Sequence, residues 1–322
     1  MIFGSLRKRW QQWWNARHPR SDTLLLTQRN VYILPTRAGW MFAATLLVLL
    51  LASINYQLSL GFVLTFLLAG SGIVSMHVTH ATLRGLALHL RPVPAVHAQD
   101  AAAIEVVLAS ESTRPRYGVG LRLRDAAPPH WIWVDIAAGG QSTAHLSFVA
   151  PQRGRLALPS IVLETRFPLG LFRAWAEWRP ASTLLAWPRA EAPAATLPPA
   201  GVLGGEAASV PSRGGDEFDG VRAYRRGDPL KLVVWKKVAR SGGTELISRD
   251  TRASQRSELW LDWAATGTLA PEDRLSRLTG WLLAAERAGL AWGLRLPGAE
   301  LTPAAGEGQR RAGLELLALW RA

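Results

Sequence analysis

The chain has 322 residues, enough for two domains with separate hydrophobic cores. It contains no cysteine, which excludes disulfides, thiol catalysis and cysteine-ligated metal sites. Its 37 Lys and Arg residues outnumber 24 Asp and Glu residues, and the net charge of +13 favours an anionic partner: nucleic acid, an acidic protein or a membrane surface.

A basic segment opens the chain, and a long uncharged run follows it. Residues 1–38 carry Lys and Arg at seven positions against a single acid. No Asp, Glu, Lys or Arg occurs in residues 38–83, and one bilayer crossing takes about 20 apolar residues. The run therefore predicts a two-helix transmembrane hairpin over residues 39–79, with apolar helices near 40–54 and 58–78.

The positive flank sets the expected orientation of this hairpin. Lys and Arg concentrate on the cytoplasmic side of membranes, so we expect residues 1–38 to lie inside. A hairpin then returns the chain to the cytoplasm, which predicts a multi-pass protein with cytoplasmic soluble domains. A single crossing is the alternative, and it would make everything after residue 80 an envelope-facing binding module.

Residues 80–190 predict an all-β sandwich domain. Short apolar runs with period-two alternation recur about every ten residues, and proline or glycine separates them. The expected strands are residues 86–90, 104–108, 119–123, 131–136, 144–149, 156–163, 171–178 and 184–187. No acidic cluster, His pair or nucleophile arrangement stands out, so this domain is expected to support or bind rather than to catalyse.

A second folded region follows a linker. Residues 191–214 are rich in Pro, Ala and Gly, which predicts a loose connection. Residues 215–322 then alternate predicted strands and helices, which is typical of a small α/β domain with a parallel sheet. The expected strands are 244–249, 258–263 and 291–296, and the expected helices are 271–288 and 309–320.

Charged and aromatic side chains are densest in residues 216–240. Asp228 and Pro229 predict a helix start there, because Asp caps free N–H groups and Pro suits the first helical position. Trp235 is expected to anchor this helix in the core. An ion-pair network between Arg222, Asp228 and Arg240 is the structural interpretation of the charged residues.

The functional interpretation of the same segment is a docking surface. Its cations exceed what local acids can pair, which favours an acidic protein partner. Nucleic acid is not expected, since no exposed aromatic residues interleave with the basic ones. The cations in question are Arg225, Arg226, Lys231, Lys236 and Lys237.

The pentapeptide GGDEF at residues 214–218 is the signature of diguanylate cyclases. Such a short motif counts only inside its own fold. The cyclase fold places strands and helices before the pentapeptide, whereas this chain has a predicted β-sandwich and a linker there. A cyclase therefore remains only a remote alternative.

The pattern around this segment resembles the signature of the bacterial domain-of-unknown-function family 58, E-F-x-x-hydrophobic-R-x-Y-x-x-G-D followed by W-x-x-x-A-R. The matching residues are Glu217, Phe218, Val221, Arg222, Tyr224, Gly227, Asp228, Lys231, Val233, Trp235, Ala239 and Arg240. A second stretch, R-G at residues 153–154 and F-P-L-G-L-F at residues 167–172, is similar to another element of that family. Val238 and the short C-terminus depart from its pattern.

This resemblance implies a truncated von Willebrand factor A-like module after the signature. It also implies a non-enzymatic adaptor of the bacterial inner membrane, which docks a MoxR-type AAA+ ATPase in the maturation or remodelling of a protein complex. The sequence has no P-loop, so ATP hydrolysis would belong to that partner. No cofactor or small-molecule substrate is implied.

The resemblance also implies a degenerate metal site. In such folds a D-x-S-x-S loop after the first strand holds magnesium through hard oxygens. At the corresponding place Asp262 and Thr266 keep oxygen-bearing positions, but Ala264 replaces a ligand. We therefore expect no bound metal, and we expect Asp262 to cap a strand end or a helix.

Overall fold

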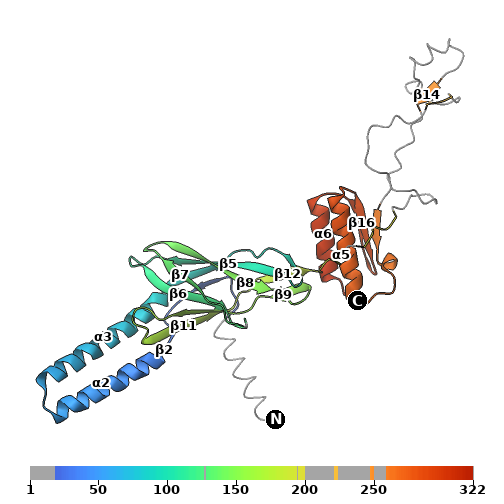
Figure 1. Cartoon of the computed structure of the whole chain (residues 1–322). Helices are drawn as coiled ribbons and strands as arrows, with labels where there is room; N and C mark the ends of the chain where they lie inside the picture. The colour runs from blue at the N-terminus through green and yellow to red at the C-terminus, as the bar shows by residue number, and fades with distance from the viewer. Residues whose placement is uncertain are drawn as a thin grey trace. The chain divides into compact units, whose positions relative to one another are not determined.

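The computed structural model describes residues 19–126, 128–193, 195–199, 221–223, 247–249 and 259–321. The pattern of contacts divides the chain into two compact units, Met1–Arg189 and Ala190–Ala322. Each unit is described by itself. Figure 1 gives the element labels used below.

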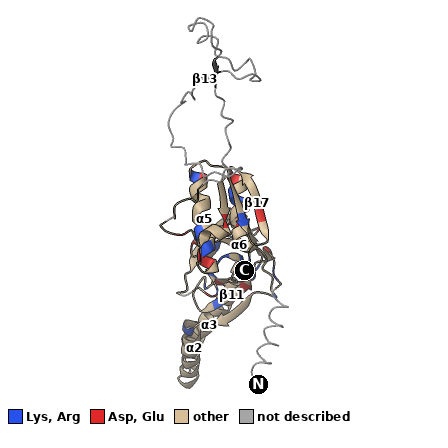
Figure 2. Cartoon of the chain, turned by 90° about the vertical axis from the view of Figure 1, so that its right-hand side faces the viewer, with Lys and Arg blue, Asp and Glu red and all other residues tan. Residues whose placement is uncertain are grey.

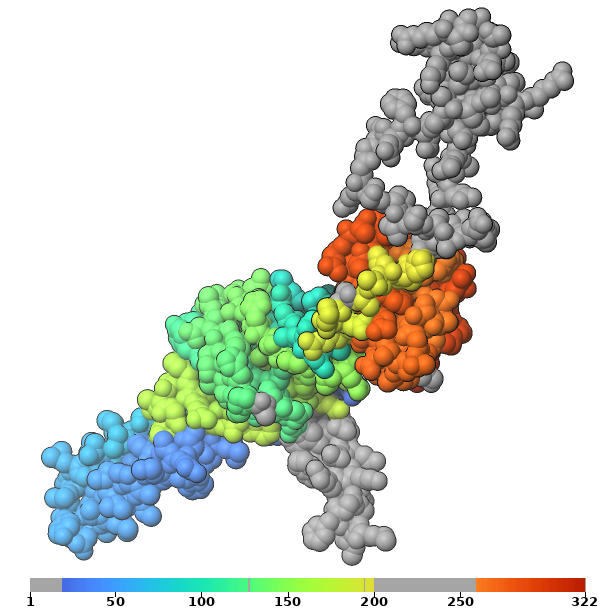
Figure 3. All heavy atoms as spheres, turned by 45° about the vertical axis from the view of Figure 1, so that its right-hand side comes forward, coloured from blue at the N-terminus to red at the C-terminus, as the bar shows by residue number. Residues whose placement is uncertain are grey.

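Two helices form a hairpin at the start of the first unit. They are α2 (Arg37–Asn55) and α3 (Ser59–Leu83), and both are long and apolar enough to cross a membrane by length and composition. The predicted pair of apolar helices is therefore confirmed. Most of the hairpin is tan in Figure 2, the colour of residues other than Lys, Arg, Asp and Glu. Figure 3 shows the hairpin protruding from the strands of the same unit.

The strands of the first unit form two antiparallel sheets and a small third one. The first sheet has the order β1 (Thr23–Leu25), β3 (Leu86–Leu90), β5 (Ala101–Ser110) and β8 (Gln141–Val149). The second has the order β2 (Tyr32–Pro35), β11 (Phe172–Trp178), β10 (Ile161–Thr165), β6 (Arg116–Leu123) and β7 (Ile132–Ile136). The third joins β4 (Val96–His97), β12 (Thr183–Trp187) and β9 (Gly154–Ala157), with β12 parallel to β4.

One hydrophobic core lies between the two larger sheets. Alternate residues of a strand point to one face, and the inward set includes Leu88 and Ile104 of the first sheet and Leu121 and Leu163 of the second, all essentially inaccessible to solvent. This arrangement is the β-sandwich that the alternating pattern predicted. At about 25 cal/mol per Å² of apolar surface, such burial is the main stabilising term of the unit.

Residues 19–36 belong to the sandwich rather than to a separate basic segment. Strand β1 pairs with β3, and β2 pairs with β11. The Trp178 indole donates to the Ser21 carbonyl at 2.7 Å. Asp22 is partly desolvated, which alone would raise its pKa, but hydrogen bonds from the hydroxyl and N–H of Ser182 and from the N–H of Ala181 lower the pKa below its usual value.

The single strand expected over residues 156–163 is wrong. The structure divides this stretch into β9 and β10, which belong to different sheets. Pro159 lies between them, and proline has no N–H to donate to a sheet ladder.

A buried arginine fixes the end of α3 to the sandwich. Arg116 on β6 is 9% exposed, and its Nε donates to Ser110 Oγ at 2.7 Å. Its Nη1 donates to the carbonyls of Ala81 and Thr82, in the last turn of α3. Burial lowers the pKa of Arg116. The guanidinium therefore supplies the partners that the carbonyls at a helix C-terminus otherwise lack.

The turn between β10 and β11, residues 166–171, holds both helices. The Thr36 hydroxyl donates to the Gly170 carbonyl at 2.7 Å and accepts from Gly39 N–H, so Thr36 caps α2. The Thr79 hydroxyl of α3 donates to the Phe167 carbonyl at 2.8 Å. This turn contains most of the F-P-L-G-L-F element noted in the sequence, and its carbonyls accept hydrogen bonds from both helices of the hairpin.

The second unit contains a three-stranded sheet and two helices. In chain order its elements are β15 (Leu259–Asp262), the short 3-10 helix η2 (Trp263–Thr266), α5 (Pro271–Arg287), β16 (Trp292–Leu296), β17 (Ala299–Ala304) and α6 (Glu307–Leu319). Strands β15 and β16 are parallel, as predicted, but β17 returns antiparallel to β16. The turn at Pro297 and Gly298, where Gly298 has a φ of +80°, makes this hairpin.

Both helices of this unit pack on one side of its sheet. Trp292 of β16 is fully buried, and a Cβ built on Gly313 of α6 would lie 2.5 Å from its indole ring. Leu278 and Leu282 of α5 are fully buried as well. Trp260, which is paired with Gly293, lies on the opposite side of the sheet, because successive side chains alternate.

Candidate functional site

The signature segment lies almost wholly outside the described residues. Its one described element is β13 (Val221–Ala223), which pairs antiparallel with β14 (Ile247–Arg249) so that Arg222 faces Ser248 in the register. The roles expected for Glu217, Phe218, Tyr224, Gly227, Asp228, Lys231, Trp235, Lys236, Lys237 and Arg240 stay predictions.

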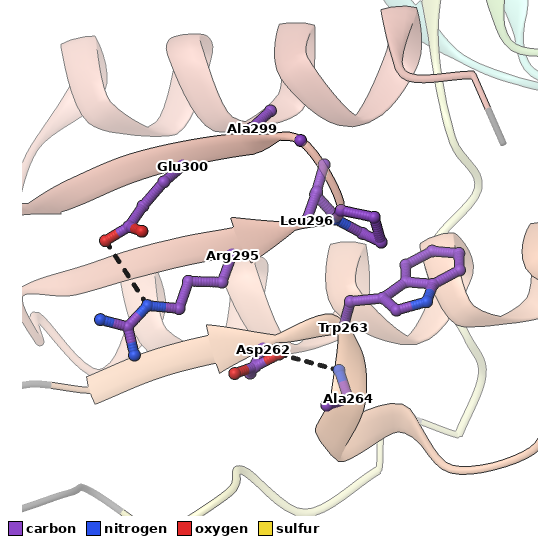
Figure 4. A pocket seen from close by; sticks show the side chains of 9 residues that line it. Asp262, Trp263, Ala264, Arg295, Leu296, Ala299 and Glu300 are labelled. Atoms are coloured by element: carbon purple, nitrogen blue, oxygen red, sulfur yellow. Dashed lines mark hydrogen bonds and ion pairs between the residues drawn. The ribbon is translucent and has the colours of Figure 1, made fainter.

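A pocket of about 570 Å³ lies at one end of the strands of the three-stranded sheet. It lies where the parallel strands β15 and β16 end and where the turn to β17 begins (Figure 4). In open α/β sheets, the carboxyl ends of parallel strands are the usual place for ligands. The pocket is therefore the candidate site among the residues that the structure describes in this unit.

Three charged residues form a row across the sheet at this pocket. Asp262 on β15 pairs in register with Arg295 on β16, which pairs with Glu300 on β17. Arg295 Nε lies 3.5 Å from Glu300 Oε1, an ion pair between largely exposed side chains. The Arg295 guanidinium also lies 3.7 Å from the centre of the Trp260 ring, and this cation–π contact fixes its position.

An aromatic wall bounds the pocket beyond β15. Trp263 begins η2 directly after Asp262 and packs against Trp320, with ring centres 4.5 Å apart. Arg274 of α5 lies 5.0 Å from the centre of the Trp263 ring. These contacts hold the indole in place, so the pocket has a rigid apolar side facing the charged row.

Each of the two residues expected at the degenerate metal site makes a hydrogen bond of its own. The Asp262 carboxylate accepts a hydrogen bond from Ala264 N–H at 2.8 Å and so caps η2, the structural role expected for it. Thr266 is buried, and its hydroxyl donates to the Trp263 carbonyl at 2.6 Å. Within the described part of the chain, no cluster of three His, Cys, Asp or Glu side chains is placed to hold a metal.

The pocket combines charged and aromatic groups. Its lining provides one guanidinium, two carboxylates and an indole, but no hydroxyl, thiol, amine or imidazole nucleophile. Arg295 and Glu300 were missed in the sequence because only the β16–β17 pairing makes them neighbours.

The chain matches no family model, and no curated protein matches it.

Proposed function

We propose that this protein is a non-enzymatic, membrane-anchored docking protein. The observation that carries the proposal is the joint between the apolar hairpin and the β-sandwich. Arg116 binds the end of α3, and Thr36 and Thr79 bind the β10–β11 turn, so each helix is tied to the sandwich by side-chain hydrogen bonds. A hairpin held in this way serves as a fixed anchor rather than as a loose tether.

The proposal includes membership of the domain-of-unknown-function family 58 and a truncated von Willebrand factor A-like second unit. The sequence signature supports the family assignment. Two features are compatible with such a module. Strands β15 and β16 are parallel, and a pocket lined by Asp262 lies at their carboxyl ends. Deletion of residues 190–322 should abolish partner binding but leave the anchored sandwich folded, as limited proteolysis of the remaining protein can establish.

The proposed location is the bacterial inner membrane, with both ends of the chain and both units in the cytoplasm. Support comes from the positive flank of α2 and from the two apolar helices. Reporter fusions at the C-terminus test this orientation: a fluorescent protein that matures only inside should be active, and alkaline phosphatase should be inactive. The reverse result would favour the envelope-facing alternative.

The proposed partner is a MoxR-type AAA+ ATPase. The full-length protein in detergent should bind the purified ATPase of the same bacterium on a biosensor surface. Replacing Lys236 and Lys237 with alanine should weaken binding, because it removes two cations of the proposed docking surface. The matched control replaces Arg310 and Arg311, two consecutive cations of α6, with alanine. This control should leave binding unchanged. Equal binding by both double variants would refute docking through the signature.

The cyclase alternative has a direct test of its own. Purified protein incubated with GTP and magnesium should yield no cyclic dinucleotide. Product that disappears on Asp216→Ala or Glu217→Ala would reject the docking proposal in favour of an enzyme.

A further inference from the structure

A second cavity, of about 460 Å³, lies beside the first turn of α2. Its lining comes from three parts of the first unit: the end of β2 with the start of α2, the β10–β11 turn, and β11 itself. The residues are Leu34, Pro35, Thr36, Arg37, Ala38, Arg166, Gly170 and Arg173. These residues are far apart in the sequence, and the cavity exists only because the hairpin is seated on the sandwich.

Positive charge dominates this cavity. Three of the lining residues are arginines, and two of them, Arg166 and Arg173, pair with Glu164, whose side chain is 2% exposed. Arg166 Nε donates to Glu164 Oε1 at 2.8 Å, and Arg173 Nε lies 2.6 Å from Oε2 in an ion pair without hydrogen-bond geometry. Within the described ranges Arg37 has no ion pair. Arg166 and Arg173 thus share one carboxylate, and Arg37 adds a third guanidinium, so the three arginines exceed Glu164 by two positive charges.

The cavity also lies where a membrane surface would be. Arg37 is the first residue of α2, and the uncharged run begins at the next position. One turn further on, Trp40 is 67% exposed, and tryptophan is enriched at the boundary between lipid tails and headgroups. Leu169, in the turn that lines the cavity, is 57% exposed, and Leu34 is exposed as well. An arginine cavity here borders apolar side chains that suit acyl chains.

We propose that this cavity binds the phosphate headgroup of an anionic phospholipid. Arginine binds phosphate oxygens through paired, charge-assisted hydrogen bonds. The first turn of α2 adds the positive end of the helix dipole, although its Gly39 N–H is already bonded to Thr36. Basic pockets beside membrane helices are places where anionic headgroups bind. The site requires the hairpin to be in a bilayer, but it requires neither the docking partner nor a particular orientation.

The occupant is a lipid rather than free phosphate because of the cavity's borders. A free phosphate ion would use the guanidinium groups alone. A phospholipid would in addition place its chains along Trp40 and Leu169, where apolar surface is otherwise left in water when no bilayer is present.

The test uses the full-length protein in mild detergent. Equal amounts of phosphatidylglycerol and phosphatidylcholine are added, and native mass spectrometry records the lipid retained. The wild type should retain phosphatidylglycerol preferentially. The variant with Arg37→Gln and Arg166→Gln should bind it about tenfold or more weakly, because charge-assisted contacts are lost. Arg173 stays in this variant to pair with Glu164, and Arg37→Gln alone covers the case in which the double variant does not fold.

Arg155→Gln is the matched control. It removes one exposed arginine from β9, which lies at the end of the sandwich away from the hairpin in Figure 1, and it should leave lipid binding unchanged. Inorganic phosphate in large excess should not displace phosphatidylglycerol. Equal retention of both lipids, an unchanged Arg37→Gln variant, or displacement by phosphate would each overturn the assignment of a lipid site.

Discussion

Arg277 of α5 holds the carboxylate of Glu191 in a two-pronged ion pair. Arg277 Nε donates to Glu191 Oε2 at 3.0 Å, and Nη2 donates to Oε1 at 2.9 Å. The Glu191 N–H also donates to the Ser276 carbonyl at 3.0 Å. The linker predicted for residues 191–214 therefore begins with a residue that is fixed on α5.

The Glu191–Arg277 pair predicts a loss of stability in acid. The hydrogen bond from Arg277 lowers the pKa of Glu191 below its ordinary value of 4.5. Because the folded-state pKa is the lower one, the stabilisation is complete above the unfolded value and declines as the pH falls through the folded value. Glu191→Gln should remove this part of the pH dependence, measured by hydrogen exchange of the α5 amides. A double-mutant cycle of Glu191→Gln and Arg277→Gln that shows no coupling energy would contradict this contribution of the ion pair.

Arg116→Ala should loosen the joint between α3 and the sandwich. The change removes a buried guanidinium and leaves Ser110 and two helix carbonyls without their donor, which costs about 3 kcal/mol of unfolding free energy. Thermal unfolding of the protein in detergent measures the loss. Arg114→Ala, at an exposed arginine two residues earlier, should change stability little. Similar effects of both substitutions would disprove the role of Arg116.

Gly39→Ala should separate α2 from the β10–β11 turn. A Cβ at this position would lie 2.1 Å from the Leu171 carbonyl oxygen, so the backbone must shift, at a cost of about 2 kcal/mol or more. Gly70→Ala in α3 is the matched control, since its Cβ meets no atom within 4 Å. Protease protection of the hairpin–sandwich joint should fall only for Gly39→Ala.

Gly313→Ala tests the packing of the second unit in the same way. Its Cβ would lie 2.5 Å from the Trp292 ring and 2.8 Å from Leu282, which predicts a loss of about 1–3 kcal/mol. Gly308→Ala, in the same helix, meets nothing within 4 Å and should be neutral or slightly stabilising. Hydrogen exchange of the α6 amides can follow both variants, and a neutral Gly313→Ala would reject this packing.

Magnesium should leave the stability of the second unit unchanged. A ligand that binds only the folded state raises the melting temperature. Magnesium requires several oxygen ligands in a strict octahedral arrangement, whereas Asp262 caps η2 and the Thr266 hydroxyl is bonded to Trp263. Melting curves with magnesium and with EDTA should coincide. A shift that Asp262→Asn removes would reveal a metal site after all.

Sequence pattern found the long strands of the sandwich because each has one face on the core. Burial alternates over five or more residues in strands β3, β5 and β8. The strands it did not find are β1, β2 and β4, with three, four and two residues. Strands this short show no detectable alternation of apolar and polar residues. They form because longer strands pair with them.

The sites depended even more on non-local pairing. The β17 strand contains Pro303 and was not predicted, so the Arg295–Glu300 pair was not predicted either. Proline is tolerated there because β17 is an edge strand of its three-stranded sheet. The arginine cavity likewise unites residues 37, 166 and 173, which only the seating of the hairpin brings together.

The joint at Arg116, Thr36 and Thr79 has a mechanical consequence. Both legs of the hairpin are tied to the sandwich, so a pulling force on the sandwich divides between two helices. Neither helix can detach from the sandwich without breaking its own hydrogen bonds to it. In the proposed membrane setting, such a mount lets the sandwich bear load through both helices at once.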